Sequence, residues 1–241
     1  MITTKKKHNP FTVASKLVKK SIAISFGRSA NDFCAKSCRV YGACYATRIE
    51  RMYTDLEKKM LNHYMHGPVW VLNKALAQLP NRFIPWARLS VDGALPAKSD
   101  MEPKRWKVYV RKLRELVAKC SARGAKWHIP VETMGKARTY RKELRGLGVV
   151  VRRSSQARTV KKLLSENDTR SWIAATEIHK GCVNNSEKAR NVELAQSVAT
   201  EARKHNISAV VCPAITSDSQ CGKCTACSNE SVQLVVYPFH P

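Results

Sequence analysis

The chain has 241 residues, and 43 Lys and Arg against 18 Asp and Glu give it a formal net charge of +25. Hydrophobic residues make up 44% and charged residues 25% of the sequence, which is ordinary globular usage and excludes a disordered, collagen-like or coiled-coil protein. The length allows a substantial core, and no apolar run reaches the ~18–20 residues that span a bilayer, so we expect no membrane partner. Lysines interrupt the apolar residues after position 10, which argues against a signal peptide and predicts a cytoplasmic location.

The first half of the chain predicts two strands and three helices. A short strand over residues 21–25 leads into a loop that holds three cysteines. Helical patterns follow over 45–65 and 68–79, the second with a proline at its start, which is typical of a helix N-terminus. A strand is expected over 86–90, and a long basic helix over 104–120 carries one apolar stripe.

The second half repeats the order strand then helix. Because parallel strands need crossover helices, about six βα units predict an α/β protein with a parallel sheet, either doubly wound or a partial barrel. The expected strands are 127–131, 149–151, 172–175, 209–211 and 232–237, and the expected helices are 137–144, 157–164 and 187–204.

Ligands of parallel α/β proteins bind beyond the carboxyl ends of the strands. Polar residues at these ends are therefore candidate ligand contacts, and the alternative is that each is an ordinary loop side chain exposed to solvent. Of Arg152 and Arg153, alternation turns one toward the interior, where it can hold a phosphate or carboxylate, and leaves the other on the surface. The candidates at these ends are Ser90, Asp92, Gly93, Glu132, Thr133, Arg152, Arg153, Ser154, Thr176, Glu177, His179 and Cys212.

Two cysteine clusters carry the strongest chemical signal. Cys34, Cys38 and Cys44 form a C-x3-C-x5-C loop, and three thiolates can hold a [4Fe–4S] cluster with one open iron or a zinc ion with one open position. Cys221, Cys224 and Cys227 form a C-x2-C-x2-C run that Cys212 can complete as a fourth ligand. The tight run favours iron–sulfur over structural zinc, and buried thiols are the alternative for the first loop. Cys120 and Cys182 lack metal-ligand spacing.

Positive charge is concentrated between residues 98 and 162, where 20 basic residues stand against 5 acidic ones. This suits a polyanion partner, above all nucleic acid, although a solvated basic surface is the alternative. The aromatic residues Trp106, Tyr109 and Trp127 can stack on bases, but their spacing favours the core, and His63 and His66 read as surface histidines. The candidate nucleic-acid contacts are Lys104, Arg105, Lys112, Arg138, Arg141 and Lys142.

The strand, tri-cysteine loop and helix at the start of repeated βα units resemble the radical S-adenosylmethionine (SAM) superfamily. That resemblance implies a partial (β/α) barrel, SAM bound to the open iron, an external electron donor and hydrogen abstraction by a 5′-deoxyadenosyl radical. The superfamily's usual loop is C-x3-C-x2-C, whereas the second gap here is five residues, and the nearby aromatics are Tyr41 and Tyr45.

Short motifs from about residue 21 onward are similar to those of an uncharacterised phage and plasmid family, the gene product eighty-eight family, which has no assigned reaction. They are Cys44-Tyr45-Ala46, Arg88-Leu-Ser90-Val-Asp92-Gly93, Cys212-Pro213-Ala214, the C-x2-C-x2-C run and His240. Ser90-Val91-Asp92 stands where that family has Ser-Gly-Asp. The resemblance implies a phage or plasmid origin, action in the host cytoplasm and a SAM site at Ser90, Asp92 and Gly93; an Asp-Gly turn is the alternative.

These observations predict a basic arm over 1–20, a partial barrel over 21–211 and a Cys-rich loop with a final strand over 212–241, packed on the same domain. The expected function is a radical-SAM-like iron–sulfur protein acting on nucleic acid or a nucleotide, with one or two [4Fe–4S] clusters. The alternative is a non-enzymatic nucleic-acid-binding protein with structural zinc or iron–sulfur sites. The expected cofactor contacts are Ser90, Asp92, Gly93, Tyr45, Glu132 and Arg152.

Overall fold

The computed structural model describes residues 11–12, 22–24, 66–89, 95–155, 159–165, 171–175, 185–217 and 224–238. Its strands form one sheet in the order β1-β2-β3-β4-β5-β6-β8-β7, in which β1 pairs antiparallel with β2 and every other pair is parallel. The chain is therefore an α/β protein with a predominantly parallel sheet, as predicted. The strands are β1 (Phe11–Thr12), β2 (Ile22–Ile24), β3 (Trp86–Leu89), β4 (Lys126–Val131), β5 (Val149–Ser155), β6 (Ser171–Ala175), β7 (Ala209–Val211) and β8 (Leu234–Pro238).

Helices connect most of these strands, and the expected helices within the described residues are confirmed with small shifts of their ends. Proline opens α4 and α5, where its missing N–H costs no helical hydrogen bond. The helix expected over 45–65 lies outside the described residues, and no described helix is long and apolar enough to cross a membrane. The helices are α4 (Pro68–Ala77), α5 (Pro103–Ser121), α6 (Met134–Glu143), α7 (Val160–Ser165), α8 (Asn185–Lys204) and α9 (Pro213–Thr216), with single turns η3 (Lys98–Asp100) and η4 (Ala226–Ser228).

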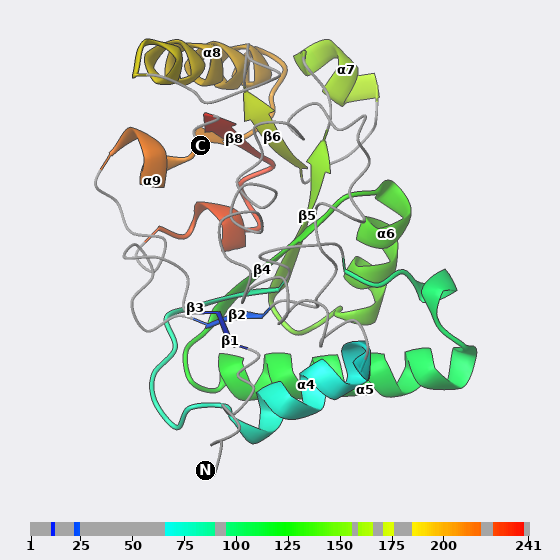
Figure 1. The fold of residues 1–241 in the computed structure, drawn as a ribbon. Coiled ribbons are helices and arrows are strands. Elements are labelled where there is room, and N and C mark those ends of the chain that lie inside the picture. The colour runs from blue at the N-terminus through cyan, green and yellow to red at the C-terminus, as the bar shows by residue number, and fades with distance from the viewer. Residues whose placement is uncertain are drawn as a thin grey trace, which may run out of the picture.

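One face of the sheet, here called the outer face, is covered by helices. Alternate strand residues such as Leu89, Ile129 and Val151 join α4, α5 and α6 in one apolar cluster, and Leu234 and Val236 join α7 and α8 in a second. The strand registers place all these residues on the same side of the sheet. Figure 1 shows the helices following one another around the twisted sheet, from α4 and α5 at the bottom to α7 and α8 at the top.

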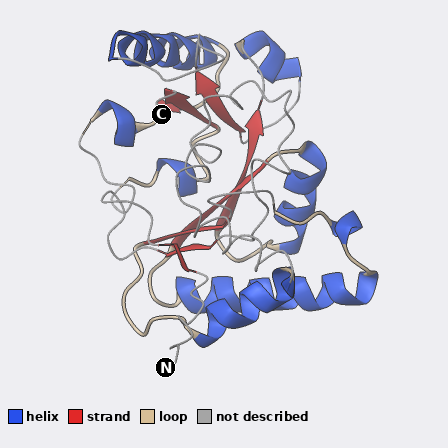
Figure 2. Ribbon diagram, viewed as in Figure 1, coloured by secondary structure: helices blue, strands red, loops and turns tan. Residues whose placement is uncertain are grey.

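The opposite face, here called the inner face, carries the residues between these apolar ones. It includes Arg88, His128, Arg152 and Val235, and η4 packs against it over β4 and β5. Figure 2 shows the strands as a single layer, with the helices of the outer face along one side of it. Among the described residues, the longer helices α4 to α8 join the outer clusters, while the single turn η4 packs on the inner face.

Strand β8 lies between β6 and β7 and pairs with both. The chain therefore passes over one strand position when it runs from β6 through α8 to β7, and β8 fills that position afterwards. As a result, the chain after residue 212 supplies an inner strand of the sheet, Leu234–Pro238.

Strand β5 runs further than its apolar residues Val149–Val151 predicted, and it includes both Arg152 and Arg153. The expectation that one of these arginines lies on the surface is wrong, because Arg153 is only 8% exposed and Arg152 is fully buried. Strand β1 lies within the stretch 1–20 expected to be a basic arm, and it pairs with β2.

Candidate functional site

Arg152 fixes a cysteine-containing loop to the inner face. Its guanidinium is fully buried and donates to five main-chain carbonyls. Nε bonds Cys227 O at 2.8 Å and Nη1 bonds Gln233 O at 3.3 Å. Nη2 reaches the carbonyls of Ala226, Asn229 and Val232 at 3.0, 2.9 and 2.8 Å. Since Arg cannot lose its proton in a protein, the loop is folded around a permanent positive charge.

His128 lies beside this arginine on the inner face. Burial lowers the pKa of its imidazole well below the usual value of 6.5, and the positive charges of Arg88 and Arg152 lower it further. The ring also packs against the indole of Trp86, with ring centroids 5.1 Å apart. His128 is therefore neutral at pH 7, which is the form that binds metals and accepts protons.

Sequence reasoning missed His128 and Trp86 as candidate site residues. The run from Trp127 to Val131 predicts a strand buried on both faces, in which a histidine looks like part of the core. Alternation held the missing signal, because Trp127 and Ile129 pack on the outer face and so place His128 on the other side.

Cys212 and Cys227 lie in one apolar cluster near β7 at the edge of the sheet. Cys212 directly follows β7, and both cysteines belong to a small cluster with Val232 and Val235. Cys212 is buried, while Cys224 and Cys227 are half-buried. Within the described residues, no three His, Cys, Asp or Glu side chains gather closely enough to hold a metal ion. The remaining predicted ligands, Cys34, Cys38, Cys44 and Cys221, lie outside the described residues.

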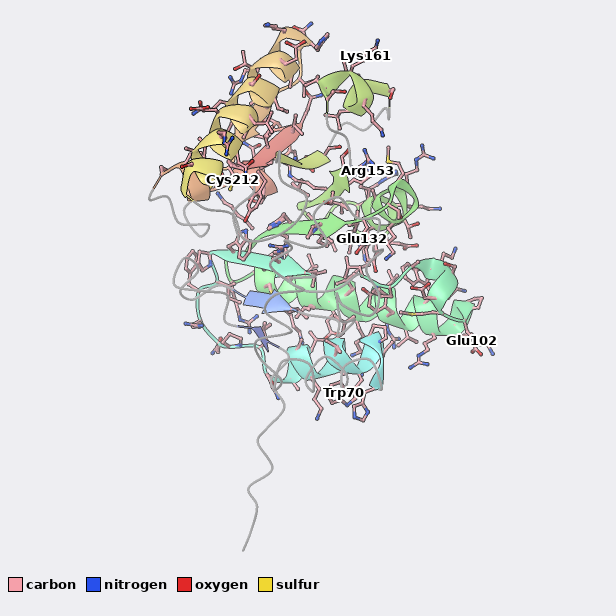
Figure 3. The ribbon with its side chains drawn as sticks, turned by 45° about the horizontal axis from the view of Figure 1, so that its top comes forward. Trp70, Glu102, Glu132, Arg153, Lys161 and Cys212 are labelled. Carbon is pink, nitrogen blue, oxygen red and sulfur yellow. The ribbon has the colours of Figure 1, made fainter. Side chains whose placement is uncertain are left out.

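Of the residues expected to contact a cofactor, only Glu132 and Arg152 are described. Glu132 follows β4 at the carboxyl edge of the sheet, where its exposed carboxylate pairs with Lys136 Nζ at 3.0 Å. The same ammonium donates to Leu95 O, so the pair connects this edge to the segment before η3. Figure 3 shows Glu132 and Cys212 well apart along the sheet. The other candidates at strand ends, Tyr45, Ser90, Asp92, Gly93, Thr176, Glu177 and His179, lie outside the described residues.

Four of the six predicted nucleic-acid contacts are exposed on the helices of the outer face. Lys104 and Arg105 lie at the start of α5, and Arg138 and Lys142 lie on α6. Their charges are available to a polyanion at the surface.

The other two predicted contacts, Lys112 and Arg141, have partners within the fold. Lys112 Nζ lies 3.2 Å from a carboxylate oxygen of Glu115. Arg141 donates from Nε and Nη2 to Val151 O at 3.2 and 3.1 Å, which connects α6 to β5. A role in nucleic-acid binding stays a prediction for both.

The aromatic residues assigned to the core by their spacing are indeed buried. Trp106 and Tyr109 belong to α5 and Trp127 to β4, and all three pack in the cluster of the outer face. Cys120 is buried in the same cluster, and burial raises the pKa of its thiol to about 12, so it is an inert core residue.

Comparison with known proteins adds no relative. No family model, no curated protein and no solved structure matches this chain.

Proposed function

We propose that this chain is an iron–sulfur protein of radical-SAM-like type that acts on nucleic acid or a nucleotide. In this proposal the sheet is a partial (β/α) barrel, with its helices outside and its inner face toward the ligands. Cys34, Cys38 and Cys44 hold one open [4Fe–4S] cluster, and SAM lies against Ser90 and Asp92. The second cysteine group, with Cys212, holds another cluster. When bound, such clusters transfer single electrons and, at the open iron, cleave SAM reductively.

The observation that carries the proposal is the attachment of the C-terminal cysteine loop to the inner face by Arg152. Five carbonyl acceptors on one buried guanidinium define the loop's position, including that of Cys227 itself.

The donor set fits a thiolate-bound cluster in its chemistry, with Cys212 and Cys227 already in one apolar cluster. Because the described residues hold no ready group of three ligands, the proposal requires Cys224 and Cys221 to join these two when the metal binds. Coupling of metal binding to local folding is usual for such sites.

The test is the iron and sulfide content of protein purified without oxygen. About eight iron and eight sulfide per chain indicate two cubes, and about four indicate one. Cys227→Ser and Cys212→Ser are expected to lose the second cluster, and Cys34→Ser the first. Cys120→Ala is the matched control and is expected to keep both clusters, because Cys120 is a buried thiol in the apolar cluster that joins α4, α5 and α6. Protein with neither iron nor sulfide after reconstitution contradicts the proposal, as does failure of the iron-loaded protein to cleave SAM under reduction.

A second candidate is a nucleic-acid-binding protein whose metal is purely structural. The observation in its favour is the exposure of Lys104, Arg105, Arg138 and Lys142 on α5 and α6. It predicts about one zinc per chain without sulfide, no SAM cleavage and an affinity that falls steeply with salt as counterions are released. Binding that does not change with salt contradicts it.

A further inference from the structure

An open pocket of about 460 Å³ lies on the outer side of the molecule, between the first turns of α4 and α5. One wall comes from α4, with His66, Trp70 and Asn73, and the other from the start of α5, with Glu102, Lys104 and Arg105. In Figure 3, Trp70 and Glu102 mark these two helices, at the end of the molecule opposite to Lys161. The pocket is of a size that takes small planar ligands.

The α4 wall is an aromatic platform. The imidazole of His66 stacks on the indole of Trp70, with ring centroids 4.6 Å apart and an angle of 22° between the planes. Lys74 Nζ lies over the same indole, 5.6 Å from its centroid. Trp70 is half-buried because it packs against the apolar cluster that joins α4, α5 and α6 on the outer face, so the platform is anchored in the core. Such stacked rings are extended readily by another flat ring.

The α5 wall supplies positive charge close to that platform. Lys104 and Arg105 are exposed cations, against the single carboxylate of Glu102 in the pocket wall. The guanidinium of Arg105 comes close to Gly67, where a Cβ atom would lie only 2.9 Å from Nη2. Gly67 also has φ +77°, a conformation that favours glycine, so this position serves both the turn before α4 and the approach of the guanidinium.

We propose that this pocket binds single-stranded nucleic acid, with a base stacked on the His66–Trp70 platform and the phosphate backbone held by Lys104, Arg105 and Lys74. Stacking next to cations is how proteins bind single strands without reading a sequence, since every base offers a flat face and every nucleotide a phosphate. A base paired within a duplex cannot enter, because its faces are covered by its neighbours. The inference rests on the nucleic-acid part of the proposed function and assigns it a site away from the cysteine loop.

The experiment measures fluorescence anisotropy of a labelled dT oligomer of about 15 nucleotides, with the full chain and at several salt concentrations. Trp70→Leu keeps the apolar packing and removes the platform, and we expect it to weaken binding about ten-fold. Arg105→Gln is expected to weaken binding less and to reduce the slope of log affinity against log salt by about 0.7. A duplex of the same length is expected to bind more weakly than the single strand and to respond little to Trp70→Leu.

Two variants serve as matched controls. Lys161→Gln removes an exposed cation at the far end of the molecule, and Phe83→Ala removes a side chain that is 67% exposed outside the pocket. Both are expected to bind the oligomer like the unchanged protein, and circular dichroism checks that every variant is folded.

Several outcomes overturn the inference. If the unchanged protein binds the oligomer and folded Trp70→Leu binds it equally well, the pocket is not the site, although nucleic-acid binding stands. If the unchanged protein binds neither single strands nor duplex, the nucleic-acid part of the proposed function fails as well, while the iron content remains a separate result. Polyglutamate serves as a competitor. If it displaces the oligomer from the unchanged protein and its own binding is weakened by Trp70→Leu, the occupant of the pocket is an acidic protein and not a single strand.

Discussion

At the scale of the residue, Arg152 does most to shape the candidate site. Its side chain replaces hydrogen bonds that the 226–233 segment would otherwise make with water, and this allows a loop with few regular backbone bonds to lie on the sheet. A methionine has similar length and no donors, so it removes the guanidinium donor from all five carbonyls, of which Gln233 O keeps the N–H of Ser171 and Asn229 O that of Val232.

We expect Arg152→Met to lower the free energy of unfolding by about 3 kcal/mol or more, because buried acceptors lose a charged donor. Urea unfolding measures this loss. The same variant is expected to increase the rate at which iodoacetamide labels Cys224 and Cys227, and to lower the iron content of anaerobically purified protein. Arg138→Met, at an exposed position of α6, is the control. Unchanged labelling in folded Arg152→Met contradicts the role given to this arginine.

His128 gives the stability a dependence on pH whose sign follows from its environment. Burial and the two neighbouring arginines lower the pKa in the folded protein below the 6.5 of an ordinary imidazole. As pH falls below about 6.5, the unfolded chain gains a proton here that the folded protein does not, so stability is fully present above that pH and is lost below it.

We therefore expect the free energy of unfolding to fall by up to about 1.4 kcal/mol per pH unit between pH 6.5 and pH 5 through this residue alone. Urea titrations at several pH values measure the slope, and His128→Gln is expected to flatten it. The exposed His205 supplies the control, since His205→Gln is expected to keep the slope. A His128→Gln variant with the full slope would assign the effect to other groups.

At the scale of elements, a buried pair of tyrosines joins α5, α6 and the segment before η3. Tyr140 Oη donates to Pro96 O at 2.8 Å, and the hydroxyls of Tyr109 and Tyr140 lie 3.0 Å apart. Because Tyr140 uses its hydrogen on Pro96, Tyr109 is the donor within the pair. Burial raises the pKa of both phenols, so both are protonated at neutral pH.

This order of donors predicts unequal effects of two similar changes. Tyr140→Phe removes the acceptor of Tyr109 and the donor to Pro96, and we expect it to cost about 2 kcal/mol. Tyr109→Phe leaves the bond from Tyr140 to Pro96 intact and is expected to cost about 1 kcal/mol. Urea unfolding of both variants gives the comparison, and equal losses, or a larger loss for Tyr109→Phe, contradict the order.

The sequence predicts the helices better than the sheet. The apolar spacing along α5 predicts both the length of the helix and its buried stripe, because apolar residues recur every three or four positions along it. The end of β5 is not visible in this way, since Arg152 and Arg153 are charged, and only the partners across the fold explain their burial. The place of β8 between β6 and β7 depends on pairing between distant segments, which no local pattern encodes.

The same contrast holds for the candidate site. Cysteine spacing identifies Cys212 and Cys227 as related, and the fold brings them into one cluster. The pocket that Trp70 and Arg105 both line was not predictable, because it needs two helices from separate parts of the sequence to lie side by side. Binding surfaces made from separate elements are invisible until the elements are packed.

At the scale of the whole molecule, the net charge of +25 opposes compaction. Ion pairs relieve this only locally, as where Glu115 lies within 3.2 Å of both Lys112 and Lys119 on α5. Repulsion between exposed groups, such as the basic side chains of α5 and α6, is screened by salt within roughly 10 Å at 0.1 M.

We expect the melting temperature to rise by about 3 °C or more when sodium chloride is increased from about 0.05 to 0.3 M, since screening weakens the repulsion in the folded state. Differential scanning calorimetry measures the shift. Heparin at low salt is expected to raise the melting temperature further, because a bound polyanion stabilises the folded chain by mass action. A constant or falling melting temperature in salt contradicts this account.

The position of β8 has a consequence for the order in which the protein takes shape during synthesis. When Ala209–Val211 leaves the ribosome, the strand that pairs with it among the described residues, Leu234–Pro238, has not yet been made. The edge of β6 that this same segment will occupy is also open at that moment. Both edges close together once residue 238 emerges, so a nascent chain stopped before that point exposes two unpaired edges to other chains, and the thiol of Cys212 takes its place only in the last step.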